Sequence, residues 1–179
     1  MMRRLLAAAL LCMSAGAAPA QSTDGVSLAS LLREEQLLQF DRFDHDTAQA
    51  IGAQLVLRAH REGKTVTIRV THGDAIVFSQ AMPGASPDHA DWIRRKNNLV
   101  QRTGHSSFYT HIEVIRSGGD FDALPGLDMR DYAAHGGAFP IIVRGQGAVG
   151  TVTVSGLPGP DDHALVVAVL KDYLGVDRL

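Results

Sequence analysis

The sequence predicts an α+β domain in which helices flank an antiparallel β-sheet. Residues 65–81 and residues 139–155 each have the pattern of two short strands joined by a glycine-containing turn, which is typical of β-hairpins. Stretches with helical periodicity precede, separate and follow these hairpins. Because the strands come as hairpins and not as β-α-β units, the order of elements argues against a dinucleotide-binding fold.

Length and composition bound the class of protein. The chain has 179 residues, 45% of them hydrophobic and 20% charged, with a net charge of −2, which suits one globular domain. A disulfide scaffold is excluded because the only cysteine is Cys12. The charge lacks the basic excess of a nucleic-acid-binding protein, so no nucleic-acid partner is expected.

The first twenty residues are expected to be a secretory signal peptide. Arg3 and Arg4 precede an uncharged stretch rich in leucine and alanine, and Ala18-Pro19-Ala20 places small residues before Gln21. The apolar run is too short for a stable membrane span. We therefore expect residues 1–20 to be removed on export to the periplasm or the medium, 21–26 to be a flexible leader, and 27–179 to be the domain.

The N-terminal part predicts two helices with a short strand between them. Ser27 offers an N-cap, and the apolar stripe behind it consists of leucines (Leu28, Leu31, Leu32, Leu37 and Leu38). Residues 37–43 are expected to turn into a strand. A second helix is expected to begin near Asp44 or Asp46 and to run to Arg61.

The middle of the chain predicts the first hairpin and an amphipathic helix. Strands are expected over residues 65–71 and 75–81, since Val66, Ile68 and Val70 alternate with polar residues. A loop over residues 82–87 leads to a helix that is expected to be capped by Asp88 and to run to about Arg102.

The C-terminal part predicts one ambiguous segment, a loop, the second hairpin and a closing helix. Residues 105–115 fit helix or strand, and we favour helix over their first half; residues 116–129 are rich in glycine and aspartate and predict a loop. Strands are expected over 139–144 and 149–155. A last helix is expected over 161–174, with its acidic first residues acting as a cap.

The most unusual stretch contains His135, Gly136 and Gly137. Adjacent glycines allow positive φ and the close approach of another group to the backbone. His135 could act as an acid or base or as an axial iron ligand. The simpler interpretation, which we favour without further information, is a tight turn in which His135 bonds a neighbouring carbonyl. The eight histidines do not form a recognisable multi-histidine metal motif.

Two other patterns have a functional and a structural interpretation. Arg94, Arg95 and Lys96 beside Trp92 are expected to form a solvated helix face, or else to bind an anion or a carboxylate. Residues 104–108 resemble half of a nucleophile elbow but have Phe108 in place of the second glycine, so we favour a helix C-cap followed by a serine N-cap over a serine hydrolase.

Three blocks, residues 37–52, 83–109 and 131–174, resemble the haem-degrading domain family, which includes haem-binding protein S-like and glycolate-operon G-like proteins. The likeness is closest to its uncharacterised branch with bacterial and fungal members. The resemblance implies a profilin-like or PAS-like domain, usually assembled into homo-oligomers, and haem binding or degradation for some relatives. Members of this branch are mostly cytosolic, so the export signal is a departure from the pattern.

The leading hypothesis is therefore an exported protein that binds haem or another tetrapyrrole, and whether it also degrades this ligand, as some relatives do, stays open. His135 would be the first choice as iron ligand and His105 the second, with Arg95 or Lys96 pairing a propionate. The apolar slot for the ring is expected to be lined by aromatic residues, Tyr109 and Phe139.

Two alternatives come from different classes. One is a non-catalytic homo-oligomeric sensor or scaffold module with a PAS-like fold. The other is a small-molecule enzyme unrelated to haem, in which His135 or His105 acts as general base and Asp131 orients it. Fold analogy alone cannot choose among the three, because this architecture hosts many functions.

Overall fold

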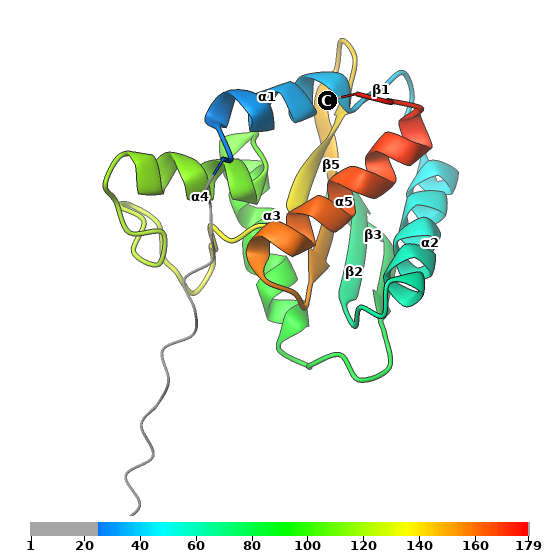
Figure 1. Ribbon diagram of the computed structural model, residues 1–179, viewed down its shortest axis with the longest axis horizontal. Helices are drawn as coiled ribbons and strands as arrows, with labels where there is room; N and C mark the ends of the chain where they lie inside the picture. The colour runs from blue at the N-terminus through cyan, green and yellow to red at the C-terminus, as the bar shows by residue number, and fades with distance from the viewer. Residues whose placement is uncertain (1–24, 179) are drawn as a thin grey trace, which may run out of the picture.

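Helices and strands alternate along residues 25–178, the part of the chain that the computed structural model describes (Figure 1). The expected signal peptide and nearly all of the expected leader lie outside these residues. In chain order the elements are α1 (Leu28–Leu37), β1 (Gln39–Phe40), α2 (His45–Arg61), β2 (Thr67–His72), β3 (Ala75–Ala81), α3 (His89–Thr103), α4 (Ser107–Arg116), β4 (Ala138–Val143), β5 (Gly147–Ser155) and α5 (Gly159–Leu174).

The five strands form one sheet in the order β1-β4-β5-β2-β3. Both expected hairpins are present: β2 pairs antiparallel with β3, and β4 with β5. β5 also pairs antiparallel with β2, which joins the two hairpins at the centre of the sheet. The short β1 lies parallel to β4, with Gln39 opposite Ile142, so the sheet is mixed at that edge. The predicted α+β class is confirmed.

Helices cover both faces of the sheet (Figure 1). α2 and α5 pack on one face and α3 packs on the other, while α1 lies against α4 beside the sheet. The main core lies between the sheet and the α2–α5 pair; Ile51, Ile68 and Leu170 there have no exposed surface. Burying each such side chain contributes about 1.5–3 kcal/mol.

The α3 face of the sheet is more polar than the α2–α5 face. Thr71 and Thr151 lie opposite each other on β2 and β5 with their hydroxyl oxygens 3.0 Å apart, and the Thr153 hydroxyl donates to Asn97 of α3. In the sequence, the alternation of apolar and polar residues over 65–71 predicted a strand with one buried and one exposed face. In β2 the polar face is covered by α3 as well, so both faces of the strand are buried.

The predicted helix caps are largely confirmed. Ser27 forms a capping box with Ser30, and the Asp44 carboxylate accepts the Thr47 N–H at 2.9 Å, which selects Asp44 over Asp46 as the cap of α2. Gly104 ends α3 in the left-handed conformation at φ 76°. Asp88 stands at the cap position of α3, but its side chain makes no capping hydrogen bond, so that prediction was wrong.

Two predicted helix boundaries need correction. α4 is helical to Arg116 and not only in its first half, because Phe108 and Ile112, four residues apart, pack together against Leu31 of α1. α5 begins at Gly159, two residues earlier than predicted, so its acidic residues lie inside the first turn. Every helix within residues 25–178 is too short or too polar to span a bilayer.

Candidate functional site

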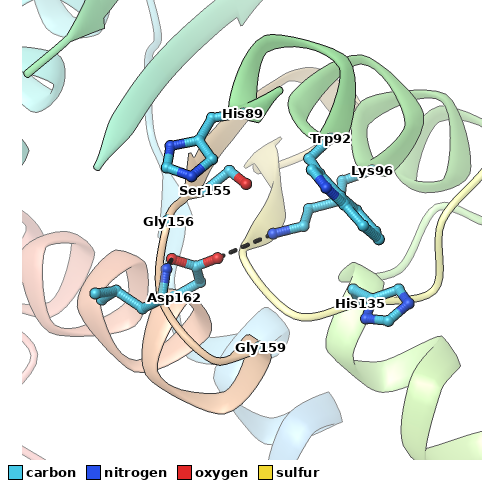
Figure 2. Close-up of a pocket in the computed structure, with 9 residues that line it drawn as sticks. His89, Trp92, Lys96, His135, Ser155, Gly156, Gly159 and Asp162 are labelled. Carbon is cyan, nitrogen blue, oxygen red and sulfur yellow. Dashed lines mark hydrogen bonds and ion pairs between the residues drawn. The ribbon is translucent and has the colours of Figure 1, made fainter. Parts of the chain in front are cut away.

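A pocket of about 220 Å³ opens between α3 and the N-terminal end of α5, where β5 ends (Figure 2). Its α3 wall is formed by residues three and four positions apart, which places them on one face of the helix. The lining residues are His89, Trp92, Lys96, His135, Ser155, Gly156, Leu157, Gly159 and Asp162.

A buried ion pair forms one side of this pocket. The Lys96 ammonium lies 3.0 Å from Asp162 Oδ2 and donates to the Val154 carbonyl at 3.2 Å; the two side chains are 3% and 1% exposed. Asp162 Oδ1 accepts the Leu157 N–H at 3.0 Å. Burial raises the pKa of Asp162 to about 6, although Lys96 opposes this, and burial lowers the pKa of Lys96. Such perturbed groups in a cleft are typical of functional sites.

Gly137 makes room for this pair. Its φ is +120°, and a Cβ there would lie 2.4 Å from the Val154 carbonyl oxygen and 2.9 Å from Lys96 Nζ. A Cβ at Gly136 would lie 2.1 Å from the Gly159 carbonyl oxygen. The predicted close approach of another group to the Gly136-Gly137 backbone is confirmed.

His135 stands at the edge of the pocket. Its Nε2 lies 2.9 Å from Asp122 Oδ1, and its ring packs edge-on against Trp92 with centroids 4.9 Å apart. Because an ionised carboxylate only accepts, Nε2 carries the proton, and in the neutral imidazole Nδ1 then keeps its lone pair. The favoured interpretation, a bond from His135 to a neighbouring carbonyl, was wrong.

That carbonyl bond is made by His111 instead. His111 Nδ1 lies 2.8 Å from the Ala134 oxygen, and the ring packs against Phe121. Burial lowers the pKa of His111 and so favours the neutral imidazole. His111 thereby holds the chain just before His135.

The three consecutive basic residues of α3, Arg94, Arg95 and Lys96, point in different directions. Arg94 is exposed and pairs with Asp91 and Asp131, as expected of a solvated face. The Arg95 guanidinium lies over the Trp92 ring, 4.0 Å from the ring centroid. Trp92 itself lines the pocket. Lys96 points inward and is buried, so the solvated-face interpretation does not apply to it.

The remaining predicted site residues lie elsewhere. His105 Nδ1 is 2.7 Å from Glu35 Oε2, and its ring lies against Tyr109, 4.5 Å between centroids, near the contact of α1 with α4. Phe139 is completely buried in the main core. The structure therefore brings His135 and Lys96 into one pocket, with Arg95 stacked on its Trp92 wall, and places His105, Tyr109 and Phe139 apart from it.

Sequence reasoning did not select His89, Ser155 or Asp162 as site residues. The spacing of His89 from Trp92 and Lys96 is a local signal that would have found the first. Asp162 was interpreted only as a helix cap, and no local signal joins it to Lys96. Within residues 25–178 no group of three or more His, Cys, Asp or Glu side chains is placed to hold a metal ion.

The fold and the pocket define a single α+β domain built on a mixed five-stranded sheet, with one polar pocket at the end of its central strand. The chain belongs to the HbpS-like haem-degrading protein family, whose model matches residues 43–171. The resemblance seen in the sequence is thereby confirmed.

Relatives and solved structures agree with this assignment. A UPF0303 protein of Rhizobium meliloti is 44% identical over 151 residues, which cover 84% of this chain and 92% of that protein. The crystal structure of the Ybr137w protein superposes with a TM-score of 0.78 at 26% identity, covering 86% and 90% of the two chains. The crystal structure of a PduOC–heme complex has a TM-score of 0.58 at 18% identity, covering 73% and 95%, and shares the fold.

Proposed function

We propose that this protein is an exported haem-binding protein in which His135 is the ligand to iron. The observation that carries the proposal is the Asp122–His135 pair, 2.9 Å apart, which fixes the imidazole and, in its neutral form, leaves Nδ1 without a partner among residues 25–178. Metal-binding histidines typically donate their other ring N–H to a carboxylate in this way. Membership of the HbpS-like family supports haem as the group that carries the metal.

The pocket fits part of a haem and not the whole group. Its volume of about 220 Å³ is below the range of roughly 300–1,000 Å³ that encloses drug-sized ligands. Haem would therefore be held at the pocket mouth, by His135 and by the aromatic surface of Trp92. When bound, haem supplies an iron centre capable of redox and oxygen chemistry.

The export part of the proposal rests on residues 1–20 alone, with their basic start, apolar stretch and small residues before Gln21. A processed protein recovered outside the cytoplasm should begin at Gln21, and intact-mass measurement of that protein tests it. A cytoplasmic product that retains residues 1–20 would contradict export.

Replacing His135 by alanine is expected to weaken hemin binding by at least tenfold and to remove the Soret shift of the complex, because the axial ligand is lost. Asp122→Asn should weaken hemin binding by roughly 10–100-fold, as replacement of a residue that hydrogen-bonds a metal ligand typically does. The measurement is a spectroscopic hemin titration of the purified protein.

His105→Ala is the matched control, since His105 pairs with Glu35 and does not line the pocket. An unchanged titration for His135→Ala, or loss of the Soret shift only for His105→Ala, would contradict the assignment. The same titration with ascorbate separates two roles: decay of the Soret band indicates haem degradation, and a stable band indicates a haem carrier.

A second candidate, a homo-oligomeric scaffold module, is favoured by the edge strand β3, which has only β2 as a neighbouring strand within residues 25–178. β3 is the last strand of the sheet, its seven residues carry no charge, and Ile76 on it is 57% exposed. Monomeric proteins usually protect such edges with charged residues. Light scattering should then show a discrete assembly that Ile76→Lys dissociates. A monomeric wild-type protein would remove this candidate.

A further inference from the structure

We infer that the α3–α5 pocket is a carboxylate-binding site whose hydrogen-bond donors are Lys96 and Ser155. The ligand class is a monocarboxylate on a short apolar stem. Two sources have this chemistry, a free short-chain acid and a propionate of haem. The second source rests on the proposed function, whereas the first does not.

Lys96 is a donor whose hydrogen bonds are incomplete. An ammonium group has three N–H bonds, and Lys96 uses two of them, on Asp162 and on the Val154 carbonyl. The third N–H of this buried group is left for a ligand. An unpaired buried polar group costs about 1–3 kcal/mol, so a ligand acceptor at this place would be favourable.

Lys96 and Ser155 converge on one space. In Figure 2 the Lys96 ammonium and the Ser155 hydroxyl point into the pocket from α3 and from the end of β5, and the His89 ring closes the side opposite His135. Gly156 permits this arrangement, since a Cβ there would lie 3.1 Å from His89 Cε1 and 2.7 Å from the Thr65 carbonyl oxygen. The site is therefore open in the middle and has donors around it.

The carboxylate oxygens of the pocket are already occupied by the protein. Asp162 Oδ1 accepts the Leu157 N–H, and Oδ2 faces Lys96. What remains for a ligand is mainly donors, so the pocket selects a group that accepts hydrogen bonds. Because Asp162 already balances the charge of Lys96, a monoanion suits the site better than a phosphate dianion. Trp92 and Leu157 form the apolar wall against which a short aliphatic stem would pack.

Trp92 provides a site-specific probe, because it is the only tryptophan of the chain and lines the pocket. Sodium propionate should change its fluorescence saturably, while propionamide, which has the same shape without the charge, should not. Ser155→Ala should weaken propionate binding by roughly 10–100-fold, the loss of one hydrogen bond to a charged group. His60→Gln, an exposed position on α2, is the control and should bind as the wild type does.

A parallel titration with hemin and hemin dimethyl ester, followed at the Soret band, identifies the source. If hemin binds at least tenfold more tightly than the ester, and Ser155→Ala reduces this difference, the site binds a haem propionate. Equal binding of the two with propionate binding retained assigns it to a free acid. Propionate binding without any hemin binding supports the carboxylate site and overturns the proposed function. An unresponsive Trp92 together with equal binding of hemin and its ester overturns the carboxylate site.

Discussion

Replacing Lys96 by methionine is expected to lower the free energy of unfolding by about 3–5 kcal/mol at pH 7, because it leaves the Asp162 carboxylate buried without its counter-ion. The measurement is urea unfolding followed by circular dichroism. Lys96→Met/Asp162→Asn is the matched control: it removes both charges and keeps an oxygen to accept the Leu157 N–H. We expect this double variant to recover most of the lost stability.

The loss of stability in Lys96→Met should increase as the pH rises. The folded-state pKa of Asp162 is raised to about 6 from an ordinary value of 3.8, so the stability linked to its protonation is complete below about pH 3.8 and is lost as the pH rises through about 6. Without Lys96 this pKa rises further. Lys96→Met should therefore be most destabilising at pH 7–8 and less so near pH 5. A loss that is equal at both pH values, or a double variant no more stable than the single one, would contradict the buried pair.

Replacing Gly137 by alanine is expected to cost about 2–6 kcal/mol. Part of the cost is the backbone conformation, since φ +120° is unfavourable for any residue with a Cβ and such strain costs about 1–3 kcal/mol. The rest is overpacking against the Val154 carbonyl and the Lys96 ammonium, typically about 1–3 kcal/mol. Thermal and urea unfolding measure the sum.

Gly145→Ala separates these two causes. Gly145 also has positive φ, at +76°, but a Cβ there would meet nothing within 4 Å. It should therefore show the conformational cost alone. Equal losses for the Gly137 and Gly145 variants would mean that the close approach of Lys96 and Val154 to Gly137 does not determine stability.

Two costly features meet at the same pocket. The buried Lys96–Asp162 pair and the His89 nitrogen, which has no partner within residues 25–178, each lower stability relative to an apolar alternative. Proteins retain such features mainly where function requires them. Their coincidence supports this pocket as the functional site, independently of any single residue in it.

Most of the fold could be predicted from the sequence because its signals are local. Glycine turns and alternating Val66, Ile68 and Val70 predicted the first hairpin, and Ser27 and Asp44 marked two helix starts. The errors came where tertiary contacts decide. α4 is helical through the segment that fitted helix or strand, because α1 packs against it. β1 pairs with β4, about a hundred residues away in the sequence.

The candidate site was only partly predictable. His135 and its two glycines stood out by composition, and Lys96 was noted among basic neighbours. Nothing local indicated that Lys96 alone of its run would be buried, that Asp122 would reach His135, or that His105 would lie in a separate cluster.

By itself, then, the sequence determined the family, the order of helices and strands, most of their caps and the need for glycine beside His135, because each depends on residues close together in the chain. The tertiary structure alone decided the pocket. Lys96 and Asp162 are 66 positions apart, and their pairing exists only because α3 and the start of α5 pack at the end of β5. Burial there, and not residue type, turned an ordinary surface lysine and a helix-capping aspartate into a coupled pair with shifted pKa values.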